Sequence, residues 1–151
     1  MKGILLIDHG SRRGEANAML VCVANLVQHM VADTAVVRYA HMELAEPSIA
    51  RGFANCVEGG ADEVVAFPYM LSPGKHSTAD IPRMVAAAAA AFPGVQYSVT
   101  PAFGVHEKLA ELILARAGVA PACAASHGAR CWDPAKSGTA CEDACRARST
   151  V

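Results

Sequence analysis

Residues 4–14 read ILLIDHGSRRG, and this stretch decides the fold of the chain. The consecutive aliphatic residues at 4–7 are typical of a strand that is buried on both faces of a sheet. A short polar loop, 9–14, then leads into a segment, 15–32, that is predicted to be a helix. Its large apolar residues recur at helical spacing: Met19, Val23, Leu26, Val27 and Met30. The chain therefore opens with a strand, a loop and a helix, as α/β folds do.

The same alternation continues to about residue 118. We predict further strands at 34–42, 63–68 and 95–100, because these segments are apolar or rich in β-branched and aromatic residues.

Helices are predicted between these strands from their start and stop residues. Pro47 suits the first turn of the second helix, which the glycines at 59–60 end. Asp80 is predicted to cap the third helix, and Gly118 to end a last helix over 105–117. The order βαβαβαβα predicts a three-layer α/β fold, with a four-stranded parallel sheet, right-handed crossovers and helices on both faces.

The composition agrees with one folded domain. Of the 151 residues, 53% are hydrophobic and 18% charged, which excludes intrinsic disorder. The net charge of −1 argues against nucleic-acid binding, because nucleic-acid proteins carry a basic excess. No apolar run approaches the ~18 residues that span a membrane, and residues 1–8 lack the longer apolar run of a secretory leader. We expect a soluble, cytoplasmic protein whose cysteines are reduced.

The distribution of cysteine divides the chain into two parts. Most of the cysteines fall after residue 122, where the aliphatic periodicity is lost and glycine, proline, serine and threonine increase. We therefore predict a folded body, 1–118, and a Cys-rich C-terminal tail, 119–151.

The loops that lead from strands into helices are where open parallel sheets bind their ligands. In this chain they are 9–14, 43–46, 69–79 and 101–104. The first is not a phosphate-binding loop, because its glycines fit neither GxGxxG nor GxxxxGK[ST]. The acidic residue at position 8 also argues against a phosphohistidine phosphatase, since a carboxylate repels phosphate. We therefore expect no nucleotide.

Three of these loops each bring one metal-ligating or proton-exchanging side chain to the same edge of the sheet: His9, Glu43 and His76. Two imidazoles and a carboxylate suit Fe²⁺, Co²⁺, Ni²⁺ or Zn²⁺, and imidazoles also act as bases near neutral pH. Each residue alone also fits a structural role: a histidine at such a turn commonly caps a helix, and Glu43 would complement a helix dipole. Their occurrence on three successive loops favours a shared site.

Three motifs occur in order along the body: LIDHGSR at 6–12, MELAEPSI at 42–49 and FPYMLSPGKH at 67–76. Together they resemble the sirohydrochlorin chelatases, the class II chelatases of the CbiX and SirB type, over nearly all of 1–118. The resemblance implies the chelatase α/β fold and the insertion of Co²⁺, Fe²⁺ or Ni²⁺ into a sirohydrochlorin-type tetrapyrrole, in cobalamin or sirohaem biosynthesis. It also implies a homodimer, the state of the family's short members.

By this resemblance His9 and His76 match the family's two active-site histidines, and Glu43 its acidic partner. We predict that the neutral imidazoles bind the metal ion and pass it to the ring nitrogens, while Glu43 accepts protons and balances charge. Residues of the same loops are predicted to bind the substrate's peripheral carboxylates: Ser11, Arg12 and Lys75. A non-catalytic carrier that delivers a transition metal is the alternative function.

The other histidines and the isolated cysteines of the body are expected to be structural. His29 lies in a predicted helix and His41 in a predicted strand, whereas His106 suits the cap of the last helix. Cys22 and Cys56 are predicted to be small buried hydrophobic residues.

The tail carries a further set of metal-ligating residues: Cys123, His127, Cys131, Cys141 and Cys145. Their spacing lacks the CxxC pairs of common zinc ribbons and matches no standard ferredoxin run. An iron–sulfur cluster, a zinc or metal-storage site that uses the histidine, and a tail without ligand all stay open. We favour metal binding, because some sirohydrochlorin chelatases carry a C-terminal cluster.

Overall fold

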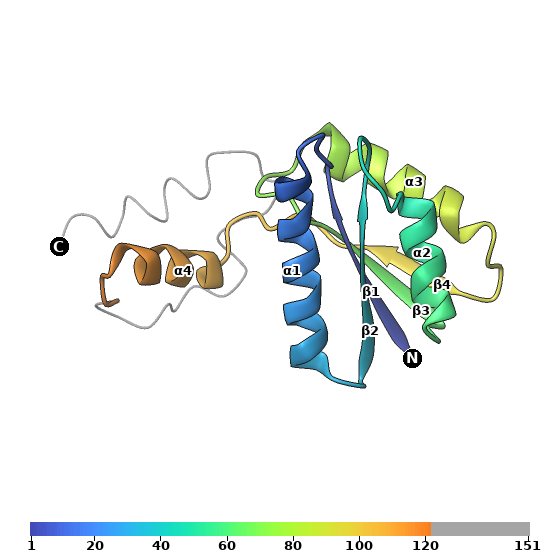
Figure 1. The fold of residues 1–151 in the computed structure, drawn as a ribbon, viewed down its shortest axis with the longest axis horizontal. Helices are drawn as coiled ribbons and strands as arrows, with labels where there is room; N and C mark the ends of the chain where they lie inside the picture. Colours follow the sequence, from blue (N-terminus) through green and yellow to red (C-terminus); the bar gives the residue numbers. More distant parts are fainter. Residues whose placement is uncertain (122–151) are drawn as a thin grey trace. The chain divides into compact units, whose positions relative to one another are not determined.

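The computed structural model describes residues 1–121 of the chain (Figure 1). The predicted tail ligands, from Cys123 to Cys145, lie outside the described residues. The chain divides into two compact units, one of Met1–Ala102 and one that starts at Phe103. The predicted boundary between a body and a tail at residue 118 stays a prediction.

The first unit alternates strands and helices. Its strands are β1 (Lys2–Asp8), β2 (Ala35–His41), β3 (Glu63–Pro68) and β4 (Gln96–Val99). Its helices are α1 (Gly14–Val31), α2 (Ile49–Glu58) and α3 (Ile81–Ala89), and a π-helical turn (His76–Asp80) directly precedes α3.

Within residues 1–121, the strands form one four-stranded parallel sheet in the order β2-β1-β3-β4. The central strand β1 pairs with β2 on one side and with β3 on the other. Parallel strands need crossover connections, which α1 provides between β1 and β2, α2 between β2 and β3, and α3 between β3 and β4. The predicted α/β fold class is confirmed.

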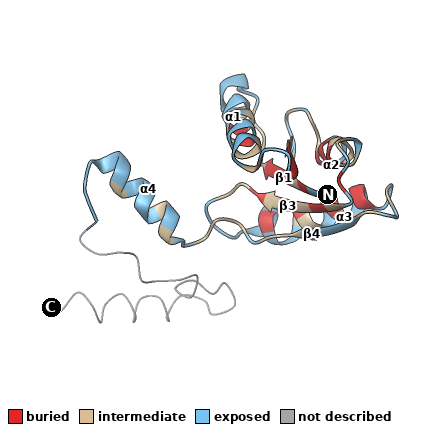
Figure 2. Ribbon diagram, turned by 90° about the horizontal axis from the view of Figure 1, so that it is seen from below, coloured by how far each residue is buried: buried red, intermediate tan, exposed pale blue. Residues whose placement is uncertain are grey.

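The apolar run of β1 is buried on both faces of the sheet. Leu6 packs with Leu20 and Ala24 of α1, whereas Leu5 and Ile7 belong to the core beneath α2 and α3. Figure 2 shows α1 on one side of the sheet and α2 and α3 on the other. Because each face of β1 meets a helix layer, its sequence is continuously aliphatic rather than alternating.

Helix α1 leaves several of its large apolar side chains exposed. Met19, Leu26 and Met30 are exposed, while Leu20 and Ala24 are buried against the sheet. The small side chain of Ala24 lets the helix backbone approach the strands closely. The spacing of apolar residues therefore predicts the helix correctly but identifies its buried face only in part, through Val23 and Val27, which pack against the same buried cluster.

The prediction that Cys22 and Cys56 are both buried is wrong for Cys22, which is exposed. At about 100° per residue, Cys22 points away from the buried Leu20 two positions before it. Cys56 of α2 is fully buried, and this burial raises the pKa of its thiol to about 12, against a smaller opposing effect of Arg38. The thiol therefore stays neutral in the core.

Two predicted helix starts are wrong in detail. Pro47 lies before α2, after a cis peptide bond, and the side-chain oxygen of Ser48 caps the helix. Asp80 makes no capping hydrogen bond, because its carboxylate lies in the π-helical turn and binds His76 instead. An N-cap needs a side-chain acceptor, which serine supplies and proline does not.

The second unit contains α4 (Glu107–Ala117) in its described part. His106 caps this helix, as predicted, by accepting a hydrogen bond at Nδ1 from the Lys108 backbone N–H at 3.1 Å. Gly118 ends it in the left-handed region, at φ 67°, where glycine has no steric penalty. Between residues 1 and 121, no helix is both long and apolar enough to cross a membrane.

Candidate functional site

The carboxyl ends of β2, β1 and β3 lie side by side at one edge of the sheet, which Figure 1 shows at the top. The last residue pairs of the ladders are Asp8 with His41 and Ile7 with Pro68. The loops that follow these strands carry the predicted site residues. Because β1 is the middle strand of the three, the loop after β1 lies between the other two loops.

His9 and Glu43, from adjacent loops, are in direct contact. The His9 Nε2 atom lies 3.1 Å from Glu43 Oε1, and the side chains are 45% and 51% exposed. Backbone hydrogen bonds continue the pairing of β1 and β2 into the loops that follow them. The Met42 N–H donates to the Asp8 carbonyl at 2.9 Å, and the Glu43 N–H donates to the His9 carbonyl at 3.1 Å. The position of His9 is therefore fixed relative to Glu43.

Gly10 allows this close approach of the two loops. Its φ is +85°, and a Cβ atom at this position would lie 1.9 Å from the carbonyl oxygen of Glu43. Any side chain would push the loops apart or distort the backbone. The glycine is therefore required by the contact between the loops.

His76 stands at the start of the π-helical turn and faces the same site. Its ring centroid lies 5.0 Å from that of His9, with the two planes at 74°. Its Nδ1 atom is 2.9 Å from Asp80 Oδ2, four residues further on. A carboxylate on Nδ1 fixes the ring orientation and leaves Nε2 as the nitrogen that can bind a metal.

The loop before His76 is held by local bonds. The buried Ser77 hydroxyl accepts a hydrogen bond from the Gly74 N–H at 3.0 Å and lies 3.2 Å from the Gly74 carbonyl. That carbonyl also accepts from the Thr78 N–H and hydroxyl, at 2.9 Å and 2.8 Å. Lys75, the predicted carboxylate-binding residue, is exposed in this loop.

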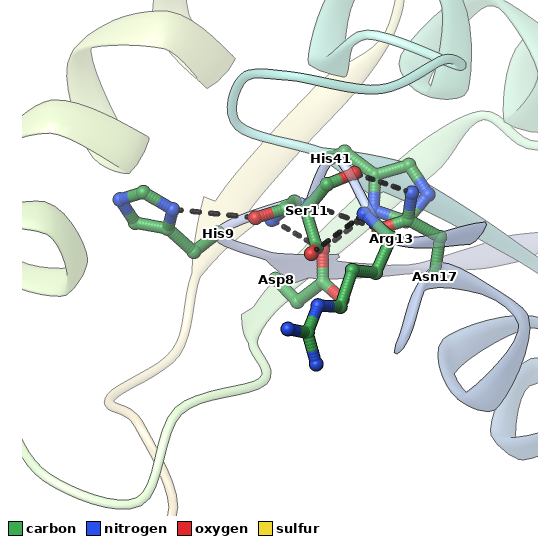
Figure 3. Close-up of polar contacts among 7 residues, drawn as sticks. Asp8, His9, Ser11, Arg13, Asn17 and His41 are labelled. Atoms are coloured by element: carbon green, nitrogen blue, oxygen red, sulfur yellow. Dashed lines mark hydrogen bonds and ion pairs between the residues drawn. The ribbon is translucent and has the colours of Figure 1, made fainter. Parts of the chain in front are cut away.

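Ser11 and Arg12 follow His9 in the first loop. The Ser11 hydroxyl accepts from the Arg13 N–H at 3.0 Å, and Arg12 is exposed. The side-chain amide of Asn17, near the start of α1, makes two hydrogen bonds with the backbone of Ser11 (Figure 3). Its Oδ1 accepts from the Ser11 N–H at 2.9 Å, and its Nδ2 donates to the Ser11 carbonyl at 2.7 Å. Sequence reasoning missed Asn17, because no capping or turn motif marks an amide at this spacing.

An open hollow of about 490 Å³ lies along the loop between β2 and α2. It is lined by residues 41–46 and by Ser48. Glu43 lies on it, so the hollow adjoins the edge where the two histidines meet.

The ionisable side chains meet here in pairs rather than in one closed cluster. In the described part of the chain, no group of three His, Cys, Asp or Glu side chains is arranged to hold a metal ion. The pairs are His9 with Glu43, His9 with His76, and His76 with Asp80.

Comparison with known proteins identifies one family over most of the chain: CbiX matches residues 3–120. A chloroplastic sirohydrochlorin ferrochelatase of Arabidopsis thaliana is 43% identical over 111 residues, which are 74% of this chain and 49% of the relative. A sirohydrochlorin cobaltochelatase of Priestia megaterium is 32% identical over 116 residues, 77% of this chain and 37% of the relative. The chain thus spans half or less of the length of these relatives.

A solved structure shares the fold. The sirohydrochlorin chelatase SirB from Bacillus subtilis subspecies spizizenii, in complex with cobalt, superposes with a TM-score of 0.70 at 29% sequence identity. The match covers 78% of this chain and 50% of that one.

Proposed function

Since the chain belongs to the CbiX family of sirohydrochlorin chelatases, we propose that it inserts a divalent metal ion, Co²⁺ or Fe²⁺, into a sirohydrochlorin-type tetrapyrrole. One observation carries the proposal: the His9 and His76 rings lie 5.0 Å apart at the ligand-binding edge of the sheet, with Glu43 3.1 Å from His9. The product would serve cobalamin or sirohaem biosynthesis.

The reaction exchanges one M²⁺ ion for two pyrrole N–H protons. His76 binds the ion through Nε2, the nitrogen that Asp80 leaves free, and His9 binds it through a ring nitrogen that exchanges its contact with Glu43 for the ion. As neutral imidazoles the two present the ion to one face of the macrocycle. The Glu43 carboxylate balances the charge of the ion and accepts one proton. The second proton goes to an imidazole once the metal has left it. Both carboxylate and imidazole then release their protons to water.

The periphery of the macrocycle needs partners for its carboxylates. Arg12 and Lys75 are exposed in the loops that carry the two histidines, and Ser11 retains its hydroxyl proton as a donor because its oxygen acts as the acceptor for Arg13. Charge-assisted hydrogen bonds from such residues are strong and directional. We assign substrate binding to Ser11, Arg12 and Lys75 on this ground.

The types of ligand at the site do not select one metal ion. Imidazole and carboxylate accept Co²⁺, Fe²⁺ and Ni²⁺ alike, and affinity order is not selectivity. The names of the two relatives include both a ferrochelatase and a cobaltochelatase. Ni²⁺ is the third candidate.

We further propose that two copies of the chain form a homodimer around the tetrapyrrole. His9 and Glu43 are about half exposed, so one copy supplies a single wall of the site. The matched SirB chain is about twice the length that this chain covers, and a second copy would provide the corresponding second half. Sedimentation of the purified chain with and without tetrapyrrole measures this.

The cysteines of the chain support two further proposals, one on its cellular compartment and one on a metal site in its tail. The described residues contain two unbridged cysteines, Cys22 and Cys56, which suits a reducing compartment. We propose the cytoplasm, with the tail cysteines as a metal or cluster site. Brown colour and visible absorbance of the anaerobically purified chain would reveal a cluster, and metal analysis would reveal zinc.

The test of the proposed activity is an anaerobic visible-absorbance assay with sirohydrochlorin and each metal ion. We expect insertion faster than the spontaneous reaction with Co²⁺ or Fe²⁺, and a strong loss of rate in His9→Ala/His76→Ala. His29→Ala is the matched control, since His29 is exposed at the far end of α1. Metal binding without faster insertion would instead identify a metal carrier.

A further inference from the structure

We infer that Asp8 and His41 are positioning residues of the site, whose buried hydrogen bond sets His9 against Glu43. The inference rests on the proposed metal insertion. Neither residue is among the predicted ligands, yet each lies next to the site in sequence: Asp8 precedes His9, and His41 lies two residues before Glu43. The pair therefore occupies the point where both catalytic loops leave the sheet.

The hydrogen bond between the two side chains is short and shielded from water. The His41 Nδ1 atom lies 2.6 Å from Asp8 Oδ1, and the side chains are 1% and 21% exposed. Asp8 and His41 are also the last residue pair of the β1–β2 ladder. The bond thus closes the sheet at the edge where the loops begin.

The same carboxylate oxygen also holds the turn that carries His9. The Gly10 N–H donates to Asp8 Oδ1 at 3.0 Å (Figure 3). One oxygen atom therefore joins the end of β2 to the turn at His9 and Gly10. Because Gly10 has a φ of +85° and abuts Glu43, a shift of Asp8 would move both the imidazole and its acidic partner.

Strand pairing alone does not require this polar pair. The preceding pairs along β1 and β2 are Leu6 with Tyr39 and Ile7 with Ala40, which close the core through apolar contact. Burying a carboxylate and an imidazole costs free energy unless they are hydrogen-bonded, and an apolar pair at this position would avoid the cost. What the polar pair adds is a fixed direction for the bond to the His9 turn.

Two substitutions of Asp8 separate geometry from charge. Asp8→Ala removes the acceptor, and we expect kcat for metal insertion to fall about 10- to 100-fold, the range for groups that orient metal ligands. Asp8→Asn keeps a carbonyl oxygen for both donors and is expected to recover most of kcat, with KM for the tetrapyrrole unchanged in both. An Asp8→Asn protein as slow as Asp8→Ala would overturn the inference.

A double variant separates positioning from loss of stability. In a His9→Ala background, Asp8→Ala is expected to lower the rate much less than in the wild-type protein, because the residue acts mainly through the placement of His9 against Glu43. Val64→Ala, a buried substitution near the opposite end of the sheet, is the control, and its effect on rate should be the same in both backgrounds. Equal effects of Asp8→Ala in both backgrounds would contradict a positioning role.

Should Asp8→Ala fail to fold, the partner residue gives the same test. His41→Asn can keep an N–H donor where Nδ1 lies, whereas His41→Leu removes it. We expect the asparagine variant to be active and the leucine variant to be slow. Equal insertion rates of His41→Leu and His41→Asn, measured at matched thermal stability, would overturn the inference.

Binding of Co²⁺ gives a readout without turnover. The part of the Co²⁺ visible spectrum that His9→Ala abolishes should weaken in Asp8→Ala and persist in Asp8→Asn. If the wild-type chain binds Co²⁺ but does not speed insertion, the proposed activity fails while this comparison still tests the positioning pair. An unchanged Co²⁺ spectrum and an unchanged Co²⁺ affinity in Asp8→Ala would contradict the positioning role of Asp8 but not the proposed metal insertion.

Discussion

The two loops that carry the histidines hold them in different ways. The loop after β1 is tied to its neighbour: the His9 carbonyl accepts from the Glu43 N–H, and Gly10 leaves no space for a side chain beside Glu43. The loop after β3 is tied to itself, through bonds of Ser77 with Gly74 and of His76 with Asp80. His9 therefore depends on the register of the sheet, and His76 on one helical turn.

This difference suggests a division of labour at the site. An imidazole fixed to an acidic partner suits charge compensation and proton transfer at the macrocycle. An imidazole on a self-contained turn can adjust to the ion without disturbing the sheet. Substitutions in the two loops should then differ in what they damage.

The largest effect is expected from the histidines themselves. His9→Ala and His76→Ala should each lower kcat/KM by about 10²- to 10⁴-fold, the usual contribution of a positioned acid–base group. The double variant should be little slower than the worse single one, because both act on the same ion. Steady-state insertion kinetics measure this, and multiplicative losses would show that the two loops work independently.

The two glycines give the sharpest contrast between the loops. Gly10→Ala places a Cβ atom 1.9 Å from the Glu43 carbonyl at a φ of +85°, so we expect a loss of about 1–3 kcal/mol in unfolding free energy together with most of the activity. Gly74→Ala meets no atom within 4 Å and should change stability by only about 0.5 kcal/mol. Denaturant unfolding measures both, and equal losses would refute the contrast.

Asp80 tests the self-contained turn. Asp80→Ala should weaken Co²⁺ binding about 10- to 100-fold, because the His76 ring loses the partner of Nδ1. Stability should change little, since His76 is exposed and such surface pairs contribute about 0–1 kcal/mol. Arg83→Ala, which removes only the 3.9 Å contact to Asp80, is the control and should bind Co²⁺ normally.

Ser77 should give the smallest effect on the rate. Ser77→Ala leaves the Gly74 N–H without its side-chain acceptor, and because water can bind this exposed N–H, the cost should fall below the roughly 1–3 kcal/mol of a buried unpaired donor. The rate should fall less than in Asp80→Ala, since the bond between His76 and Asp80 remains. A loss of rate as large as that of His76→Ala would show that the turn, and not Asp80, orients the ring.

Much of the fold could be predicted because burial leaves a direct trace in the sequence. The apolar run of β1 and the β-branched segment at 34–42 each predict a strand, and a parallel sheet brings His9, Glu43 and His76 to one edge. The buried side of α1 left a weaker trace, because the exposed Leu26 is as apolar as the buried Leu20 and more apolar than the buried Ala24. Which side of a helix is buried depends on how the helix packs against the sheet.

The partners of the histidines could not be predicted for two physical reasons. The bond between Asp8 and His41 depends on strand register, which pairs residues 33 apart in sequence. The bond between His76 and Asp80 depends on a π-helical turn, which differs from an α-helical turn by one residue in its hydrogen bonding and has no clear sequence signal. Asp80 was therefore predicted as a helix cap.

The most direct test of the central claim is X-ray absorption at the cobalt edge of the Co²⁺-loaded chain. The claim is that imidazoles from two separate loops bind one metal ion. We predict that the number of imidazole nitrogens bound to each cobalt ion is one lower in His9→Ala and in His76→Ala than in the wild-type protein. In the double variant it should be two lower. The same imidazole number in the wild-type and double-variant proteins would contradict the claim.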